Sequence, residues 1–456
     1  MRWTSSNGAE TMLNPISPST LAFKTALLPP LSCPSIPSSP TILFILSLSL
    51  SLSLSLSLSL SLSELKLPKS RMDRESAWDR LSWDLTELIL AHLPLRSLVR
   101  AAAVCKHWRN VASHPCFPSR AEAVRRRKPW FFLYGQSNVV ARNNRAFGFD
   151  PDAGEWVLLP HAGSDCFSGA GGFLFASMSS SSRFAYAPIL RSLPWTATPP
   201  LSFSRCNPLV AVFSSGRNQQ PNLIVVGGAR YVGGLVDIED RLAVEIYDPA
   251  AGSWEICPPL PVDFRSGNSS QWLSSALLPK RRLFFVLGIY SCYVSAFDLG
   301  RRAWTRVHTL RPPGVLFAFL VACGGDRLVL AGLCNAADGL PCFSIWSVDH
   351  ATLTYTEIGV MPKELLGCLF ESEDDDNRFA SLKCVGLDGL VYIFNEDHHK
   401  AYPACVCEVV DDGWGVSCTW RKVPPMPVPV SRFHKVVAFC SPVPLNSVIG
   451  VDGFRQ

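Results

Sequence analysis

Few residues of this chain combine a type and a spacing that could do chemistry. His398 and His399 follow Glu396 and Asp397, and imidazole and carboxylate groups are common metal ligands. No further ligand can be assigned from the sequence, so we expect a polar loop there and neither a metal nor another cofactor. The acidic run ESEDDDN at 371–377 is interpreted as a solvated loop, with contact to a basic partner as the alternative.

The motifs that mark common enzyme sites do not occur where a strand would present them. We find no GxSxG, HExxH, phosphate-binding loop or DxD-type cluster in such a position. A copper radical site needs a tyrosine, a cysteine and histidines that converge in space, which the sequence neither indicates nor excludes. The sequence therefore favours a protein that binds other proteins over an enzyme.

Charge and cysteine content restrict the partners and the compartment. The chain has a formal net charge of +5, of which residues 1–71 contribute +3. The remainder is close to neutral, so we expect no nucleic-acid partner. The sixteen cysteines of the chain are scattered, often inside apolar runs, and form no CxxC pairs. We therefore expect buried reduced thiols in a cytoplasmic and/or nuclear protein.

The N-terminal segment contains an alternating Leu-Ser run from Leu46 to Ser63. Its serines dilute the hydrophobicity that a membrane helix needs, and an isolated strand of this kind would have no partner. A repeated CT dinucleotide encodes Ser-Leu without end, and a charged, helix-compatible sequence starts at Met72. We therefore interpret residues 1–71 as an over-extended gene start or a dispensable disordered tail and expect no membrane association. A genuine anchor or targeting segment is the alternative.

A short helical module is expected at residues 78–117. Apolar residues at three- and four-residue steps form one helical stripe, made of Leu81, Leu85, Leu88, Ile89 and Leu93. Pro94 should end this helix, Ser97 should cap a second one, and Cys105, Trp108 and Val111 should lie on a third. Roughly 40 residues of helix cannot build a self-sufficient core. Much of this apolar surface should therefore contact another protein.

The module resembles the F-box family. The matching residues are Leu93-Pro94, Leu98 and the run VCKHWR at 104–109, whereas Ser82 stands where the family pattern has its opening proline. The resemblance implies docking to the Skp-family adaptor, and through it to the cullin, of a cullin-RING ubiquitin ligase. The adaptor-binding positions that it implies are Leu81, Leu85, Ile89, Leu93, Pro94, Leu98, Val104, Cys105 and Trp108. Packing inside the module or against the following domain is the alternative.

A basic linker is expected at 118–129. It contains Arg125, Arg126, Arg127 and Lys128 in succession. Such a run can be a nuclear localisation signal. It can also be the solvated end of a helix, where positive charge is favourable near the C-terminus. We favour the second interpretation, and the sequence leaves the first open.

A hairpin phrase recurs in the remaining chain, residues 130–456. FDPDAGEW, YDPAAGSW, FDLGRRAW and the weaker VDHATLTY start at Phe149, Tyr247, Phe297 and Val348. In each phrase an aspartate follows the first residue, and an aromatic residue stands seven positions after the first. Aspartate, proline and glycine favour turns, so we expect a strand, a tight turn and a second strand that opens on the aromatic residue. The region is therefore predicted to be all-β.

Six aromatic landmarks divide this region at intervals of roughly 40 to 65 residues. They are Trp156, Trp195, Trp254, Trp304, Tyr355 and Trp420. A unit of this length with four strands cannot bury both of its faces alone, and a ring of such sheets closes the stack. The sequence therefore predicts a β-propeller of six blades.

The repeats resemble the kelch repeat, in which a double glycine precedes a tyrosine and then a tryptophan. Gly227-Gly228 with Tyr247 and Trp254 match that pattern best. The positions expected to be structural in the propeller, packing between blades rather than contacting a ligand, are Trp156, Gly227, Gly228, Tyr247, Trp254, Phe297 and Trp304.

The two resemblances together imply an F-box/kelch-repeat protein. Such a protein is expected to be the non-catalytic substrate-recognition subunit of an SCF-type ubiquitin ligase, with an unknown protein substrate on the propeller loops. The alternative is a kelch scaffold or ligand-binding propeller without a ligase role. Substrate-binding residues cannot be read from the sequence, because specificity depends on variable loops.

Overall fold

The structure is a computed structural model, in which the described residues belong to one compact unit. It describes residues 81–445 and Val448, apart from 137–143, 160–165, 178–182, 191–194, 206, 215–220, 229–241, 268–269, 325, 336–338, 371–377, 398–402, 412, 414 and 428–434. The Leu-Ser run, the acidic run at 371–377, His398 and His399 therefore lie outside the described residues.

Four helices open the described chain: α2 (Trp83–His92), α3 (Leu95–Ala102), α4 (Lys106–Ala112) and α5 (Phe117–Val124). Ser82 caps α2, because its side chain accepts a hydrogen bond from the Leu85 N–H. Cys105 caps α4 in the same way, with its sulfur accepting from the Trp108 N–H at 3.4 Å.

One expectation about these helices was wrong. The second helix begins at Leu95 rather than after Ser97, with Pro94 as its N-cap residue. The fixed φ of proline, here −54°, suits the entry into a helix, so no polar side chain is needed there. Within the segment expected to be a basic linker, helix α5 continues to Val124 and extended chain begins at Arg125.

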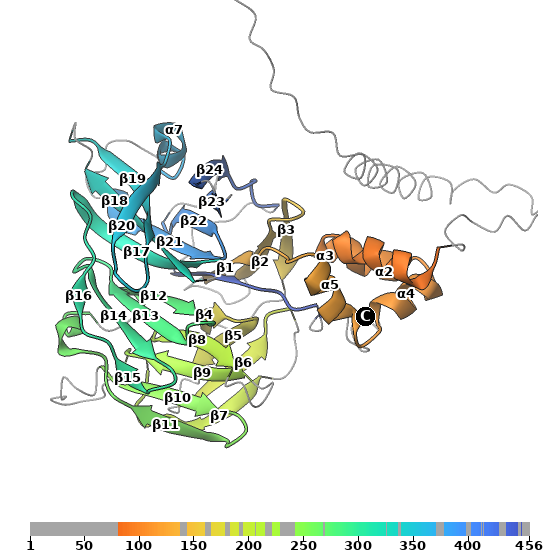
Figure 1. The fold of residues 1–456 in the computed structure, drawn as a ribbon, viewed down its shortest axis with the longest axis horizontal. Helices are drawn as coiled ribbons and strands as arrows, with labels where there is room; N and C mark the ends of the chain where they lie inside the picture. Colours follow the sequence, from red (N-terminus) through yellow and green to blue (C-terminus); the bar gives the residue numbers. More distant parts are fainter. Residues whose placement is uncertain are drawn as a thin grey trace, which may run out of the picture. The chain divides into compact units, whose positions relative to one another are not determined.

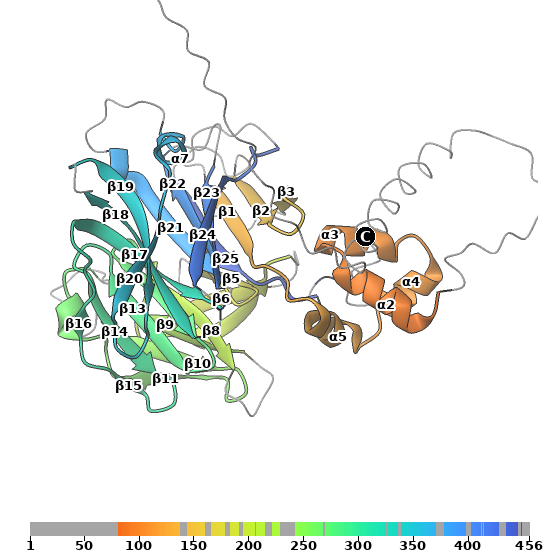
Figure 2. The same ribbon diagram turned by 45° about the horizontal axis from the view of Figure 1, so that its top comes forward.

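The rest of the described chain forms six antiparallel sheets (Figures 1 and 2). The first sheet has the spatial order β25 (Lys435–Ser441), β1 (Trp130–Gln136), β2 (Arg145–Asp150) and β3 (Glu155–Leu159). The second has the order β4 (Cys166–Ala170), β5 (Phe173–Ser177), β6 (Arg183–Pro188) and β7 (Thr196–Pro200). The third has the order β8 (Leu209–Ser214), β9 (Pro221–Val226), β10 (Val244–Asp248) and β11 (Ser253–Cys257). The fourth sheet has the order β12 (Leu273–Leu278), β13 (Leu283–Gly288), β14 (Tyr293–Asp298) and β15 (Ala303–Trp304), and β16 (His308–Thr309) also pairs with β14. The fifth has the order β17 (Val315–Cys323), β18 (Arg327–Asn335), β19 (Pro341–Val348) and β20 (Tyr355–Val360). The sixth has the order β21 (Leu382–Leu387), β22 (Leu390–Asn395), β23 (Cys405–Asp411) and β24 (Val416–Lys422). Three short helices lie between them: η4 (Val262–Phe264), α7 (Lys363–Gly367) and η5 (Arg378–Ser381).

The sheets close into a ring. The first strand of each sheet contacts the first strand of the next, in the cycle β25, β4, β8, β12, β17, β21 and back to β25. Strand β25 comes from the end of the chain yet pairs with β1, in a register from Trp130 opposite Ser441 to Gln136 opposite Lys435. This pairing joins the two ends of the ring in one blade. The fold is a six-bladed β-propeller preceded by a small helical region, which confirms the predicted fold class.

The recurrent phrase forms the hairpins that the sequence predicts. Its first and last residues lie directly opposite each other in the pairs Phe149–Trp156, Tyr247–Trp254, Phe297–Trp304 and Val348–Tyr355. In each turn the aspartate Oδ1 accepts from the N–H two residues later, as in Asp150 with Asp152 at 2.9 Å. The residue four positions after the aspartate has positive φ and is Gly154, Gly252, Arg302 or Leu353. Arg302 and Leu353 thus adopt the positive φ that glycine has in the other two turns, and the aspartate makes the same hydrogen bond in all four.

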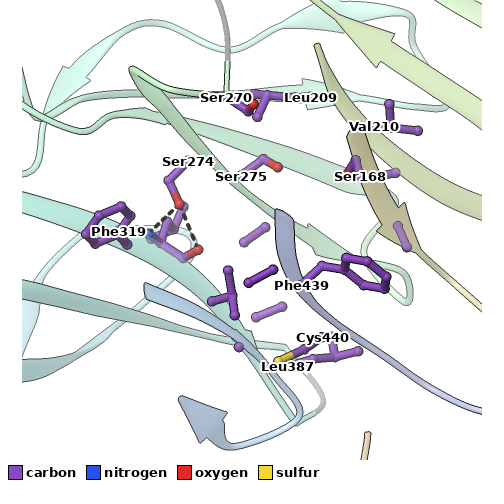
Figure 3. A pocket seen from close by; sticks show the side chains of 18 of the residues that line it. Ser168, Leu209, Val210, Ser270, Ser274, Ser275, Phe319, Leu387, Phe439 and Cys440 are labelled. Atoms are coloured by element: carbon purple, nitrogen blue, oxygen red, sulfur yellow. Dashed lines mark hydrogen bonds between the residues drawn. The ribbon is translucent and has the colours of Figure 1, made fainter. Parts of the chain in front are cut away.

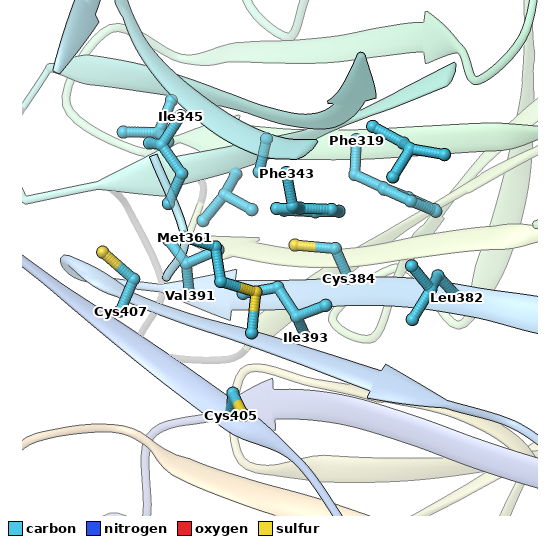
Figure 4. Close-up of a cluster of buried hydrophobic side chains, with 14 of the residues drawn as sticks. Phe319, Phe343, Ile345, Met361, Leu382, Cys384, Val391, Ile393, Cys405 and Cys407 are labelled. Carbon is cyan, nitrogen blue, oxygen red and sulfur yellow. The ribbon is translucent and has the colours of Figure 1, made fainter. Parts of the chain in front are cut away.

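The core is distributed between neighbouring blades. One cluster joins blade β17–β20 to blade β21–β24 and includes Phe319, Phe343, Val391 and Ile393 (Figure 4). Cys384, Cys405 and Cys407 are buried in the same cluster. Burial raises the pKa of the Cys405 thiol to about 12, so this side chain stays protonated and inert at neutral pH.

Candidate interaction sites

The N-terminal helical region exposes several large apolar side chains. Trp83, Leu85, Leu88 and Val104 are 39%, 51%, 44% and 54% exposed. We refer to these four residues as the helical apolar surface. A module this small cannot bury all its apolar residues, and large apolar side chains left exposed can serve as interaction sites. The helical apolar surface is therefore a candidate docking site for another protein.

The nine positions expected to bind an adaptor fall into three groups. Leu85, Val104 and Cys105 are exposed, whereas Leu81, Ile89, Leu93 and Pro94 are half-buried. Leu98 and Trp108 are buried at 0% and 6% exposure, within the module. Those two side chains therefore support the shape of the surface and are not accessible to a partner in this structure.

Trp83 is an exposed residue that the sequence analysis did not single out. Its indole makes edge-to-face contacts with the imidazoles of His107 and His114, at centroid distances of 5.8 and 6.0 Å. The His107 Nε2 in turn lies 3.3 Å from the hydroxyl of the buried Thr86. These contacts hold the tryptophan in one orientation, which reduces the entropy lost when a partner covers it. In the sequence, its position directly after the capping residue Ser82 is the only local feature that could have indicated its exposure.

The basic run is engaged by the end of α2 and by the propeller. Arg125 Nη1 donates to the carbonyl of His92 at 2.7 Å, and Arg127 Nη2 donates to that of Ala91 at 3.2 Å. These are C-terminal carbonyls of α2, where positive charge is favourable. Burial lowers the pKa of the Arg127 guanidinium. Arg125 and Arg127 therefore bind the C-terminal end of α2, a helix other than the one they follow, and both are half-buried.

The same run forms ion pairs with two blades. Arg125 pairs with Asp152 at 2.7 Å in the turn between β2 and β3. Arg126 pairs with Asp388 at 2.7 Å in the turn between β21 and β22, and Lys128 pairs with Glu408 on β23. The segment after α5 is therefore tied to the first and last blades by charge-assisted hydrogen bonds.

Three landmark tryptophans each bind their own blade to the blade before it. The indole N–H of Trp156 donates to the Pro424 carbonyl at 2.7 Å, that of Trp254 to Pro199 at 3.0 Å, and that of Trp304 to Pro258 at 3.0 Å. Each acceptor lies in or just after the outer strand of the neighbouring blade. In the sequence, each acceptor is the first proline of a Pro-Pro pair that follows the landmark aromatic residue of the neighbouring blade. This pattern could have indicated the three acceptors.

Partners at the other expected structural positions were not foreseen from the sequence. Gly227 and Gly228 follow β9 with φ of +63° and +68°, a conformation that glycine adopts without strain. The carbonyls of Gly227 and Ala243 each accept from Arg205 Nη1 at 2.7 Å. Arg205 also forms an ion pair with Glu245, and both side chains are fully buried. Tyr247 and Phe297 lie in blade cores, each against the tryptophan opposite it.

The propeller encloses a cavity of about 1040 Å³ that is lined by inner strands of all six blades (Figure 3). Its wall includes Ser168, Val210, Ser274, Phe319 and Phe439. The Ser274 hydroxyl is already bound to the backbone of Leu320, as acceptor from the N–H at 2.9 Å. The wall thus combines apolar side chains and hydroxyls with charged groups, including the Lys383–Glu396 ion pair at 3.4 Å. Such a mixed lining is suited to ligand binding.

No metal or membrane feature stands out within the part of the chain that the structure describes. In those residues no group of three or more His, Cys, Asp or Glu side chains is placed to hold a metal ion. None of the described helices has the length and apolarity required to cross a bilayer.

The comparisons with known proteins agree on the helical region. Residues 78–120 match the F-box domain family. F-box only protein 6 of Arabidopsis thaliana is 23% identical over 380 residues, which cover 79% of this chain and 72% of that protein. An F-box/kelch-repeat protein of the same plant is 22% identical over 439 residues, covering 75% of this chain and 72% of that protein. A third Arabidopsis thaliana protein, an F-box protein, is 48% identical over 54 residues, 12% of this chain and 14% of its own length.

Residues 78–120 therefore form an F-box domain, and the similarity to F-box/kelch-repeat proteins that the sequence predicts is confirmed.

Proposed function

We propose that this chain, with its F-box domain and six-bladed propeller, is the substrate-recognition subunit of an SCF-type ubiquitin ligase. The F-box domain binds a Skp-family adaptor and, through it, the cullin. The propeller binds the protein to be ubiquitinated. The observation that carries the proposal is the helical apolar surface, which leaves Trp83, Leu85, Leu88 and Val104 exposed in a domain matched to the F-box family.

The contribution of the chain to the reaction is proximity. Holding the adaptor at one end and a target at the other raises the effective concentration of target lysines near the ubiquitin-charged enzyme. No side chain of this protein needs to make or break a bond in that scheme. The buried, protonated thiols fit a reducing cytoplasmic or nuclear environment, in which ubiquitin ligases of this class would act.

A second candidate is a ligand-binding propeller without a ligase role. The observation in its favour is the cavity of about 1040 Å³, which is large enough for a small molecule. Adaptor binding separates the two candidates, because the second one does not require it.

A charged pair of substitutions in the helical apolar surface should abolish adaptor binding. We expect Leu85→Asp with Val104→Asp to weaken binding to a purified Skp-family adaptor by at least about 30-fold, since one interface hot spot contributes about 2 kcal/mol or more. Both side chains are more than half exposed, so the fold should survive. Calorimetric titration gives the affinity and circular dichroism melting reports the fold.

The matched control is Leu158→Asp on β3, where the side chain is 56% exposed but lies outside the F-box domain. It should leave the affinity for the adaptor unchanged. Parent-like adaptor binding by the double variant, with its melting temperature intact, would show that the helical apolar surface is not the docking site.

A further inference from the structure

Four aromatic side chains form a continuous series on blades β12–β15 and β17–β20. Their ring centroids are 5.7 Å apart between Trp272 and Tyr290, 5.8 Å between Tyr290 and Phe317, and 5.9 Å between Phe317 and Phe319. Exposure falls along the series from 50% and 41% to 6% and 4%. We call these four residues the aromatic ladder.

The aromatic ladder connects the protein surface to the cavity. Trp272, Tyr290 and Phe319 all line the cavity of about 1040 Å³, and Figure 3 shows the Phe319 ring at its wall. Trp272 and Tyr290 belong to loops that open onto the same edge of the propeller, before β12 and between β13 and β14. A ligand on the two exposed rings can therefore extend toward the cavity.

Further exposed apolar side chains border the ladder on the same edge of these two blades. Tyr293 opens β14 at 37% exposure, Leu316 lies near the start of β17 at 46%, and Leu340 directly precedes β19 at 50%. In an antiparallel blade, the start of strand one, the end of strand two and the start of strand three share one edge. Exposed apolar groups of this number on one edge mark an interaction surface rather than scattered surface residues.

Polar groups also lie along the ladder, at the backbone of Tyr290 and beside Tyr293. Arg311 Nη2 donates to the Tyr290 carbonyl, which holds the guanidinium next to the ladder. His308 is exposed on β16, which pairs with β14 next to Tyr293. The loop before β12 adds one carboxylate, Asp263, and one guanidinium, Arg265, whose charges offset each other. A guanidinium held at the backbone of Tyr290 is suited to a carboxylate next to an apolar side chain.

We infer that the aromatic ladder and Arg311 bind an extended segment of a partner protein, in which aromatic or aliphatic side chains stand next to aspartate or glutamate. An extended chain can lay apolar side chains on Trp272 and Tyr290 and pass a carboxylate to Arg311. Rigid aromatic anchors beside a pocket are the usual energetic centres of such interfaces. The inference rests on the proposed function in one respect, because it identifies this segment as part of the ligase target.

A library of random 12-residue peptides displayed on phage tests the inference, with the full chain as bait. Enriched peptides should combine Phe, Tyr, Trp or Leu with Asp or Glu. In fluorescence anisotropy, Trp272→Ala, Tyr290→Ala and Arg311→Glu should each weaken binding of the enriched peptides about tenfold or more. Ile256→Ala on β11, at 66% exposure and outside the ladder, is the matched control and should change binding less than about twofold.

Several outcomes would overturn the inference. They are no enriched peptide, basic enriched peptides, or binding that survives both Trp272→Ala and Arg311→Glu. Thermal melting shows whether each variant still folds. Arg311→Glu changes an exposed side chain whose contact is with the Tyr290 carbonyl, so it remains informative if Trp272→Ala is unstable. Adaptor binding is measured on the same proteins. Peptide binding that does not depend on the ladder contradicts this inference alone, whereas absence of adaptor binding by the parent contradicts the proposed function.

Discussion

Replacing Trp156 by alanine is expected to destabilise the propeller by about 3–5 kcal/mol, the usual cost of removing a large buried aromatic side chain. Trp156 is only 7% exposed and contacts the rings of Phe131, Phe147 and Phe149 at centroid distances of 6.0, 6.2 and 5.3 Å. Its indole also binds the Pro424 carbonyl of the last blade. The substitution therefore opens a cavity at the blade where the ring closes. Urea unfolding followed by circular dichroism measures the loss.

Two companion variants separate packing from hydrogen bonding. Trp156→Phe keeps most of the burial but removes the N–H donor, and should cost about 1 kcal/mol, mainly from the unpaired carbonyl. Trp195→Ala removes the corresponding landmark before β7, where the side chain is 38% exposed, and should have a smaller effect than Trp156→Ala. Equal effects of Trp156→Ala and Trp195→Ala would contradict the inter-blade role given to Trp156.

Replacing Arg205 by methionine is expected to cost about 3–5 kcal/mol, because it leaves a fully buried carboxylate without its partner. Arg205 and Glu245 are both 0% exposed as an ion pair, and Glu245 Oε1 also accepts from the Ser202 N–H at 2.7 Å. Loss of the guanidinium additionally leaves the Gly227 and Ala243 carbonyls without that donor. Chemical denaturation of parent and variant gives the difference in unfolding free energy.

The double variant Arg205→Met with Glu245→Met should recover much of this loss. Replacing both members of a buried ion pair by apolar side chains of similar size is often close to neutral. A single variant as stable as the parent, or a double variant less stable than the single one, would show that the pair is not the main contribution at this position.

Local signals in the sequence were sufficient for the hairpins and the blade number. Each phrase contains its own turn chemistry, in which aspartate binds nearby N–H groups and an aromatic residue opens the next strand. The stripe of leucines likewise predicts α2, because apolar spacing is a local property. The cap of the second helix was misjudged, since Ser97 is a good capping residue but Pro94 already begins the helix.

Contacts between distant parts of the chain were not predictable in this way. The Trp156 indole and its Pro424 acceptor are 268 positions apart, and Arg205 reaches Glu245 over 40 positions. The aromatic ladder joins Trp272 to Phe319 across two blades, so no single repeat contains its pattern. Exposure also cannot be read from type alone, as the buried Leu98 and the exposed Leu85 show. The positions of these side chains are therefore known only from the three-dimensional structure.

The central claim is that the F-box domain of this chain joins a propeller to a ubiquitin ligase. Its most direct test is affinity purification of the tagged chain at native expression, with quantification of co-purified proteins by mass spectrometry. We predict that a Skp-family adaptor and a cullin co-purify with the parent and with Leu158→Asp, and are lost from Leu85→Asp with Val104→Asp. Absence of both proteins from the parent purification would contradict the account.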